Sequence, residues 1–391
     1  MSEMILIKNG KILTMAAKNY ENGCILIENG KIIDIQEKID TPLGATVIDA
    51  QGLLVMPGII DAHCHLGMWE DSIGFEGADG NEMTSPITPH LRAIDAINPM
   101  DRTFKDAYEA GVTTVMTGPG SANVIGGQFA VIKTYGKRID DMILKAPAAI
   151  KVAFGENPKR VYNHKGQTPQ TRMATAALLR ETLIKAKDYV EKKKNGEINQ
   201  DKIPDIDIRL EALIPVLNKE IPLKAHAHRA DDIFTALRIA REFDVNITLD
   251  HVTEGHLIVE ELKKENVPLI IGPTFGTRGK VELKEKDFKT PGILSRAGIK
   301  IAIMTDHPVI PIQHLPMCAA YAVKYGMDEE EALKAITINA AEIIGVSDRV
   351  GSIEIGKDGD IVIFDGNPLD IKANSLYVLI NGNIVKEPLL L

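Results

Sequence analysis

The feature that most constrains the fold of this chain is an alternation of short apolar segments with helical stretches between residues 57 and 349. This alternation is typical of parallel βαβ units. Eight such units over roughly 250 residues match the size of a (β/α)8 barrel. We therefore predict an α/β protein built on a TIM-type barrel. A doubly wound open sheet remains an alternative, because alternation alone does not close a barrel.

The apolar segments and the helical stretches can be assigned to residues. The predicted strands are Gly58–His63, Val112–Thr117, Gln128–Lys133, Ala149–Phe154, Leu223–His226, Asn246–His251, Pro268–Gly272 and Lys300–Thr305. The clearest helical periodicity lies at Thr171–Lys194, Asp231–Phe243, Gly255–Glu265 and Pro311–Tyr325.

Both ends of the chain have a different pattern, in which apolar and polar residues alternate around turn dipeptides. "MILIKNGKI" and "CILIENGKIIDI" each contain Asn-Gly, as does "LYVLINGNIV" near the C-terminus. Asn-Gly tolerates the positive φ of tight hairpin turns, so we expect antiparallel strands. We predict a small β-sandwich domain assembled from residues 1–56 and 350–391, and a barrel domain over residues 57–349, with Pro57-Gly58 at the passage between them.

Composition limits the partners of the chain. The net charge is −9 and there is no block of Lys and Arg, so we expect a small-molecule substrate and no nucleic acid. Three widely spaced cysteines indicate a reducing compartment. The N-terminus lacks the features of a signal peptide, and no stretch approaches the ~20 apolar residues of a membrane span, so we expect no membrane association and a cytoplasmic location. A homo-oligomer is compatible with the sequence.

Histidines and one aspartate occur where predicted strands end. His63 and His65 are two residues apart, so in an extended segment both side chains point to one side. An isolated pair of this kind is more often a pair of hydrogen-bonded buried histidines. However, His226, His251 and Asp306 also lie at the carboxyl ends of predicted strands, which converge on one face of a barrel. The combination therefore predicts a metal site.

Lys151 lies in the middle of the fourth predicted strand, where its ammonium must be neutralised. One solution is carboxylation by carbon dioxide, which would turn the lysine into a carboxylate that can bridge two metals. The other is an ion pair with Glu156 or a side chain that extends to the surface. Glu156 could also be the bridging ligand itself, and the residues leave this choice open.

The ordered motifs "DAHCHLG", the lysine of the fourth strand, "HAH", "LDHVTEGH" and "MTDHP" resemble those of the metal-dependent amidohydrolase superfamily. Within it the chain looks most like the imidazolonepropionase and prolidase-like amidohydrolases. The resemblance covers essentially the whole length, and it implies an enzyme that hydrolyses C–N bonds.

The resemblance also implies a ligand set. His63, His65 and Asp306 would hold one divalent metal, His226 and His251 would hold a second, and Lys151 or Glu156 would bridge them. A single metal on His63, His65, His226 and Asp306 remains open. Zinc is the first choice for imidazole and carboxylate ligands, although manganese, iron, cobalt and nickel fit the same set.

The implied reaction is attack of a metal-activated water on an amide, a cyclic amide or a dipeptide-like substrate. Asp306 would act as general base and then as general acid. His228 or His256 would stabilise the oxyanion. Two alternatives are a deaminase acting on a ring or guanidino-type nitrogen with the same ligands, and a catalytically silent binding protein, which would be expected to have lost ligands.

Candidates for substrate contacts follow the ligand-bearing strands. Arg160 and Arg229 could hold a carboxylate. Trp69 and His307 could line the pocket. The acidic segment 70–82 could attract a cationic substrate, although a charge run of this kind is usually a solvated surface.

Overall fold

The computed structural model describes residues 4–198 and 203–388. The strands are β1 (Met4–Ile12), β2 (Tyr20–Glu28), β3 (Lys31–Gln36), β4 (Thr46–Asp49), β5 (Leu54–Pro57), β6 (Ile59–Cys64), β7 (Val112–Thr117), β8 (Ile125–Lys133), β9 (Ile143–Ala153), β10 (Leu223–Ala227), β11 (Ile247–His251), β12 (Leu269–Ile271), β13 (Ile301–Ile303), β14 (Ile361–Phe364), β15 (Ser375–Ile380) and β16 (Asn383–Lys386).

The α-helices are α1 (Arg102–Glu109), α2 (Glu156–His164), α3 (Arg172–Ile198), α4 (Ile208–Glu211), α5 (Ile214–Leu217), α6 (Ala230–Phe243), α7 (Val259–Glu265), α8 (Thr290–Arg296), α9 (Leu315–Lys324), α10 (Glu329–Ala335) and α11 (Ile338–Ile344). Short 3-10 turns include η5 (Gly255–Leu257), η6 (Val281–Leu283) and η7 (Ile312–His314).

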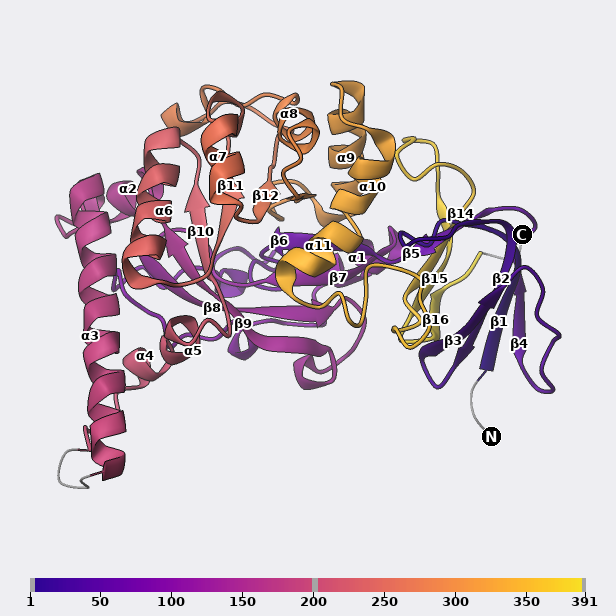
Figure 1. Ribbon diagram of the computed structural model, residues 1–391, viewed down its shortest axis with the longest axis horizontal. Coiled ribbons are helices and arrows are strands. Elements are labelled where there is room, and N and C mark those ends of the chain that lie inside the picture. The colour runs from indigo at the N-terminus through magenta and orange to yellow at the C-terminus, as the bar shows by residue number, and fades with distance from the viewer. Residues whose placement is uncertain (1–3, 199–202, 389–391) are drawn as a thin grey trace.

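The central sheet contains the eight strands expected from the sequence, in the spatial order β6 to β13. Each strand hydrogen-bonds to the next one along the chain, and helices α3, α6, α7, α8 and α9 follow on the outside (Figure 1). The four helical segments expected from periodicity are present as α3, α6, η5 with α7, and η7 with α9. The α/β barrel architecture is therefore confirmed.

One expectation about this sheet is wrong, because β8 is not part of a parallel βαβ unit. β8 pairs antiparallel with both β7 and β9, whereas every other pair in this sheet is parallel. The connection from β7 to β8 is only residues 118–124 and holds no helix. A parallel crossover needs a dozen or more residues, so a connection this short forces the chain to turn back on itself.

The first and last strands of the barrel meet through backbone and side-chain hydrogen bonds at their carboxyl ends. The amide of His65 donates to the carbonyl of His307 (2.8 Å), and the amide of Asp306 donates to the carbonyl of His63 (3.3 Å). The buried Asp61 carboxylate accepts from the amide of His63 (3.1 Å) and from both the amide (3.1 Å) and the hydroxyl (2.5 Å) of Thr305. Asp61 thus holds β6 to the segment that follows β13.

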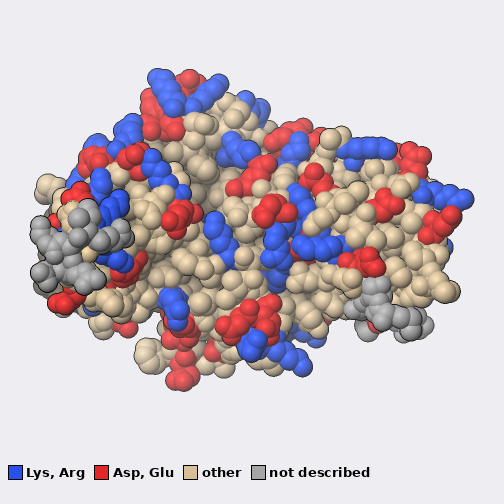
Figure 2. Space-filling model, turned by 60° about the horizontal axis from the view of Figure 1, so that its bottom comes forward, with Lys and Arg blue, Asp and Glu red and all other residues tan. Residues whose placement is uncertain are grey.

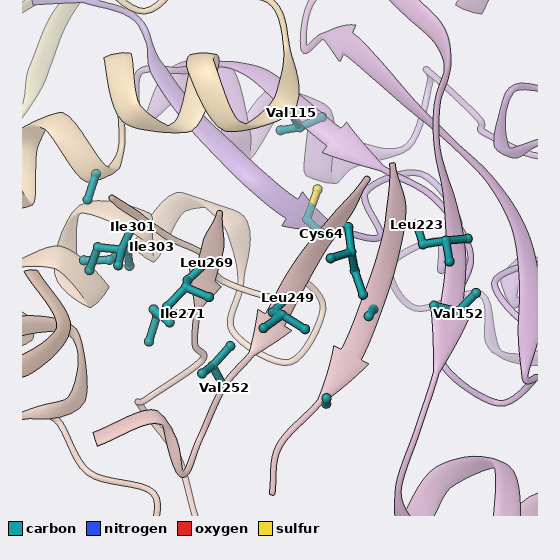
Figure 3. Close-up of a cluster of buried hydrophobic side chains, with 14 of the residues drawn as sticks. Cys64, Val115, Val152, Leu223, Leu249, Val252, Leu269, Ile271, Ile301 and Ile303 are labelled. Atoms are coloured by element: carbon teal, nitrogen blue, oxygen red, sulfur yellow. The ribbon is translucent and has the colours of Figure 1, made fainter. Parts of the chain in front are cut away.

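Side chains on the barrel strands alternate between two apolar clusters. One set faces the outer helices, and its members include Val152, Leu223, Leu249, Leu269 and Ile301 (Figure 3). The other set meets inside the barrel, with α11 against it; its members include Ile60, Phe129, Ile270, Ala302 and Met304. This alternation follows from the period of two in an extended strand.

The two ends of the chain form a second sheet in the order β16-β15-β14-β5-β1-β2-β3, with β4 also paired to β1 (Figure 1). Its buried face is rich in isoleucine, including Ile7, Ile25 and Ile361. The turns Asn29-Gly30 and Asn381-Gly382 both have positive φ and lie against each other, since a Cβ on Gly30 would come within 2.7 Å of the Asn381 carbonyl oxygen. The sheet therefore folds over so that its two ends meet.

Asn9-Gly10 differs from the expected hairpin turn, because it lies within the continuous strand β1. Asn9 has a φ of 57°, and the register of β1 against β2 shifts between Ile7 and Gly10. The Asn9 side chain donates to Asp49 (2.9 Å), and a Cβ on Gly10 would come within 2.6 Å of Val55. The dipeptide supplies the positive φ of a β-bulge, and the nearby strands β4 and β5 pair with the same strand.

A buried ion cluster lies where the barrel meets the terminal sheet. Lys133, the last residue of β8, contacts Asp358 (3.0 Å) and Asp360, and all three side chains are at most 3% exposed. Asp358 also pairs with the half-exposed Lys31 (2.6 Å) and with Arg349 (2.8 Å). The main chain of Asp360 accepts from Gly58, at the passage between the sheets.

The molecular surface carries mixed charge. Figure 2 shows Lys and Arg interspersed with Asp and Glu over the face that it displays. Within the described residues, no helix is both long and apolar enough to cross a membrane.

Candidate metal centre

The expected ligands at the end of β6 lie next to the expected aspartate. Asp306 Oδ1 is 3.3 Å from His63 Nε2 and 3.2 Å from His65 Nε2. His63 is fully buried, and neither of its ring nitrogens has a hydrogen bond of normal geometry among the described residues. A buried imidazole without hydrogen bonds is unfavourable unless another group, such as a cation, occupies its nitrogen.

A second group of histidines lies beside the first. His226, His228 and His251 each offer a ligand atom, and these atoms are all within 4.8 Å of one another. His251 also belongs to a set with His63 and Asp306 that meets the same limit. His251 therefore connects the two groups, which makes one continuous centre at the carboxyl ends of β6, β10, β11 and β13.

The backbone and the outer ring nitrogens orient these side chains. His251, the last residue of β11, and Asp306, three residues beyond β13, both have positive φ, 74° and 54°, a strained conformation that is frequent at functional sites. His65 Nδ1 donates to the Gly118 carbonyl (2.7 Å), and His251 Nδ1 donates to the Gly272 carbonyl (2.8 Å). Such bonds fix the ring so that Nε2 points at the centre.

The electrostatics suit metal ligation. Burial, reinforced by the nearby Lys151, holds the pKa of His226 and that of His251 well below the usual value, so both imidazoles are neutral. Burial alone would raise the pKa of Asp306, but the neighbouring His251, His63 and His65 outweigh it and hold that pKa well below its usual range. Neutral imidazoles and an ionised carboxylate are the forms that bind metals.

A buried ionic group lies beneath this centre. Asp250, on β11, contacts Lys151 Nζ (3.2 Å), Lys224 Nζ (2.9 Å) and His63 Nδ1 (3.1 Å). All four side chains are fully buried or nearly so. The ion-pair partner of Lys151 is therefore Asp250. It is not Glu156, which one of the alternatives drawn from the sequence had named.

Glu156 begins α2, and its backbone amide donates to Glu282 Oε2 (2.9 Å). In the part of the chain that the structure describes, its carboxylate belongs to neither group of potential ligands. Glu282 itself, in η6, is 1% exposed and faces His226 and His228 at 3.9 and 3.8 Å. Sequence reasoning missed Glu282, since it lies in a loop without any pattern.

A cavity of about 650 Å³ opens above the centre. His65, His226, His228, His251, Asp306 and Lys151 form its floor. Its walls include the apolar residues Trp69, Phe275 and Val309, the amides Asn81 and Asn157, and the cations Arg160, Lys280 and Lys286. Asn81 is the one described residue of segment 70–82 that lines it, and the acidic residues of that segment, Glu70, Asp71, Glu76, Asp79 and Glu82, are not part of the lining.

The expected substrate contacts are brought to the cavity only in part. Trp69 and Arg160 line it. Arg229 forms an ion pair with Asp231 (2.9 Å), and His256 pairs with Thr290 Oγ1 (2.9 Å), both outside the lining. His307 is buried behind the cavity, where its Nδ1 accepts from the amide of Ile312 (3.2 Å) and burial lowers its pKa to about 4.

These residues fit a divalent metal. Among the described residues, the buried ring nitrogens of His63 and the buried Oε1 of Glu282 have no hydrogen bond of normal geometry, and imidazole with carboxylate is a donor set that suits zinc and related ions.

Comparison with known proteins agrees with this geometry. A solved amidohydrolase from Thermotoga maritima MSB8 superposes on the chain with a TM-score of 0.95 and 43% identity, over 98% of this chain and 100% of that one. The chain belongs to the amidohydrolase family. The "Amidohydrolase family" model matches residues 215–388 of this amidohydrolase. The resemblance drawn from the motifs is thereby confirmed.

Two curated relatives add detail. Amidohydrolase tasK from Hapsidospora irregularis is 30% identical over 92% of this chain, which spans only 39% of the length of that relative. An imidazolonepropionase from Fusobacterium nucleatum is 26% identical over 88% of this chain and 85% of its own length. Amidohydrolases, as their name states, hydrolyse amide and related C–N bonds.

Proposed function

We propose that this amidohydrolase is a metal-dependent enzyme that hydrolyses a C–N bond in a small amide, cyclic amide or dipeptide-like molecule that also carries a carboxylate. One observation carries the proposal. Histidines from three strands and Asp306 converge on the floor of a single cavity at the carboxyl end of the barrel, where enzymes of this fold have their active sites.

His63, His65, His226, His251 and Asp306 are the residues that would hold one or two divalent ions, with zinc as the first choice. When bound, such an ion lowers the pKa of water to about 7 and polarises a carbonyl. The protein holds the imidazoles of these histidines neutral and in fixed orientations, and it buries them at the floor of the cavity.

Asp306 is the proposed general base and acid. Its carboxylate lies on the floor of the cavity and is ionised, so Oδ can accept the proton of the attacking water. The same oxygen then delivers that proton to the leaving nitrogen. The walls formed by Trp69 and Phe275 limit the water that reaches the reacting bond.

Arg160 supports a substrate with a carboxylate. It lines the cavity, and its side chain has no ion pair or hydrogen bond with residues 4–198 and 203–388. Lys280 and Lys286 add positive charge on the same wall. A guanidinium without a protein partner in such a position can bind a carboxylate in a bidentate manner.

We further propose that Lys151 remains unmodified. Carboxylation would replace its ammonium with an anion beside the buried Asp250 carboxylate, 3.2 Å from the present Nζ. Two like charges at this distance in a buried site repel strongly. The ion pair with Asp250 therefore supports a centre made of histidines and ordinary carboxylates.

A hydrolysis screen tests the proposal. The purified protein, loaded in turn with zinc, manganese and cobalt, is incubated with N-acyl amino acids, dipeptides, cyclic amides such as imidazolones, and adenosine-type rings. Products are followed by mass spectrometry and by ammonia release. Each substrate that reacts is repeated with Asp306→Asn as a control for contaminating enzymes.

The expected result is cleavage of an amide-type bond without release of ammonia, preferring substrates with a free carboxylate. Ammonia released from a ring nitrogen would identify the deaminase alternative instead. If the fully loaded protein turns over none of these classes, the proposal is refuted.

A further inference from the structure

We propose that Glu282 and His228 are metal ligands in this chain, and that with His226 and His251 they complete a four-donor site for the second ion. The inference rests on the proposed function, because it presupposes that the centre binds metal. It adds Glu282, which none of the motifs contains, and His228, the second histidine of "HAH", which the ligand set implied by the resemblance leaves out.

Glu282 is a buried carboxylate with one oxygen unused. Oε2 accepts from the amide of Glu156 (2.9 Å), which fixes the orientation of the carboxylate. Oε1 is buried and has no hydrogen-bond partner among the described residues. The cation that approaches it, Lys280, lies 3.9 Å away and donates its hydrogen bond to Asn157 (2.8 Å). A buried, half-satisfied carboxylate is costly unless a cation meets it.

The free oxygen points at two histidines. Oε1 is 3.9 Å from His226 Nε2 and 3.8 Å from His228 Nε2, which is too long for hydrogen bonds. Two donors that are each about 2.0–2.2 Å from a common tetrahedral ion lie about 3.3–3.6 Å apart. The observed spacing therefore fits donors placed around a shared cation better than donors bonded to each other.

His228 is oriented as a ligand would be. Its Nδ1 pairs with Thr253 Oγ1 (2.7 Å), which directs Nε2 toward Glu282. Its ring stacks on that of His251, with centroids 4.3 Å apart, and the ligand atoms of His226, His228 and His251 all fall within 4.8 Å of one another. The "HAH" motif at the end of β10 would thus contribute both of its histidines.

The local backbone makes room for this arrangement. Gly155 has a φ of 83°, and a Cβ at this position would come within 2.8 Å of Glu282 Oε2 and 3.0 Å of Asp232 Oδ2.

The charge of the ligand set also favours Glu282. Because Lys151 is paired to Asp250, three neutral histidines would otherwise hold the second ion without any negative charge. Glu282 supplies that charge.

Metal content and affinity test the inference directly. Wild type, Glu282→Gln and His228→Gln are loaded with cobalt, and bound metal is measured by mass spectrometry during competition with a chelator, together with the visible absorption of the cobalt. Glu285→Gln is the matched control, since Glu285 is exposed on the same loop and pairs only weakly with Lys284. Thermal melts without metal check that each variant is folded.

We expect Glu282→Gln and His228→Gln each to weaken binding of one cobalt by at least about tenfold and to change its spectrum, because loss of a direct ligand should exceed the effect of its supporting shell. Glu285→Gln should match wild type. Tryptic cleavage after Lys280 and Lys284 gives a second readout, since metal should protect this loop in wild type but not in Glu282→Gln.

If wild type binds metal and Glu282→Gln keeps its stoichiometry, affinity, spectrum and protease protection, the inference is wrong while the proposed function stands. If wild type binds no metal at all, both are wrong.

Discussion

Replacing Lys133 with methionine should destabilise the protein much more than most single substitutions. Lys133 is 2% exposed and is shared by Asp358 and Asp360, where the barrel meets the terminal sheet. Methionine keeps the length of the side chain but removes its charge. Both carboxylates then stay buried beside an apolar group.

The two aspartates do not lose equally. Asp358 keeps Lys31 at 2.6 Å and Arg349 at 2.8 Å, whereas among the described residues the Asp360 carboxylate keeps only the amide of Asn381 at 2.8 Å. Removing one partner of a buried ion pair costs roughly 3–5 kcal/mol. Because Asp358 remains compensated, we expect the lower end, about 3 kcal/mol, or a fall in Tm of roughly 4 °C.

Thermal melts followed by circular dichroism measure this effect. Lys31→Met is the matched control, because Lys31 contacts the same Asp358 but its side chain is 45% exposed, so its loss should cost about 1 kcal/mol or less. The double variant Lys133→Met with Asp360→Asn should recover at least half of the loss, since an asparagine carbonyl can still accept from Asn381.

Equal melting temperatures for Lys133→Met and Lys31→Met would refute this reasoning, because removing a buried charge would then cost no more stability than removing a half-exposed one. Failure of Asp360→Asn to recover any stability would refute the assignment of the cost to Asp360.

Three further predictions follow from the same structure. Asp306→Asn should keep the fold but lower kcat by about 10²–10⁴-fold in steady-state assays, because an amide cannot accept the proton; an active variant would contradict the role of Asp306. Arg160→Ala should raise KM at least tenfold for a carboxylate substrate and leave an esterified analogue unaffected, as compared by initial rates. Burial alone would raise the pKa of Asp358, but Lys133, Lys31 and Arg349 outweigh it and hold that pKa below its usual value of 3.8. The stabilising contribution of the Asp358 carboxylate should therefore be complete above about pH 4 and be lost as the pH falls through the lower pKa of the folded state. Urea midpoints measured from about pH 7 to pH 3 should accordingly fall less in Lys133→Met than in wild type.

Local periodicity predicted the elements of the barrel well. Each of the eight apolar segments forms a strand, since burial on both faces requires a short run of apolar residues wherever the strand lies. The direction of β8 depends on how the chain returns, which the composition of the strand does not encode. Its signal was the glycine-rich segment 118–127, too short to hold a crossover helix.

The residues of the candidate centre likewise fall into those that the sequence predicted and those that it did not. Residues at strand ends were predictable, because the fold brings those ends together. Lys224 gave the same signal as Lys151, a lysine within an apolar strand, yet their shared partner Asp250 became visible only when three strands were placed side by side. Glu282 lies in a 3-10 turn far along the chain from its neighbours, so no sequence pattern could place it.

The pairing of β5 with β14 has a consequence for synthesis on the ribosome. β5 ends at Pro57 and β14 begins at Ile361, and the two are adjacent in the terminal sheet. At about 5–20 residues per second, the partner of β5 emerges roughly 15–60 s later. During that time the N-terminal strands expose an unpaired edge and an isoleucine-rich face, so this segment is the one from which aggregation of the nascent chain should begin.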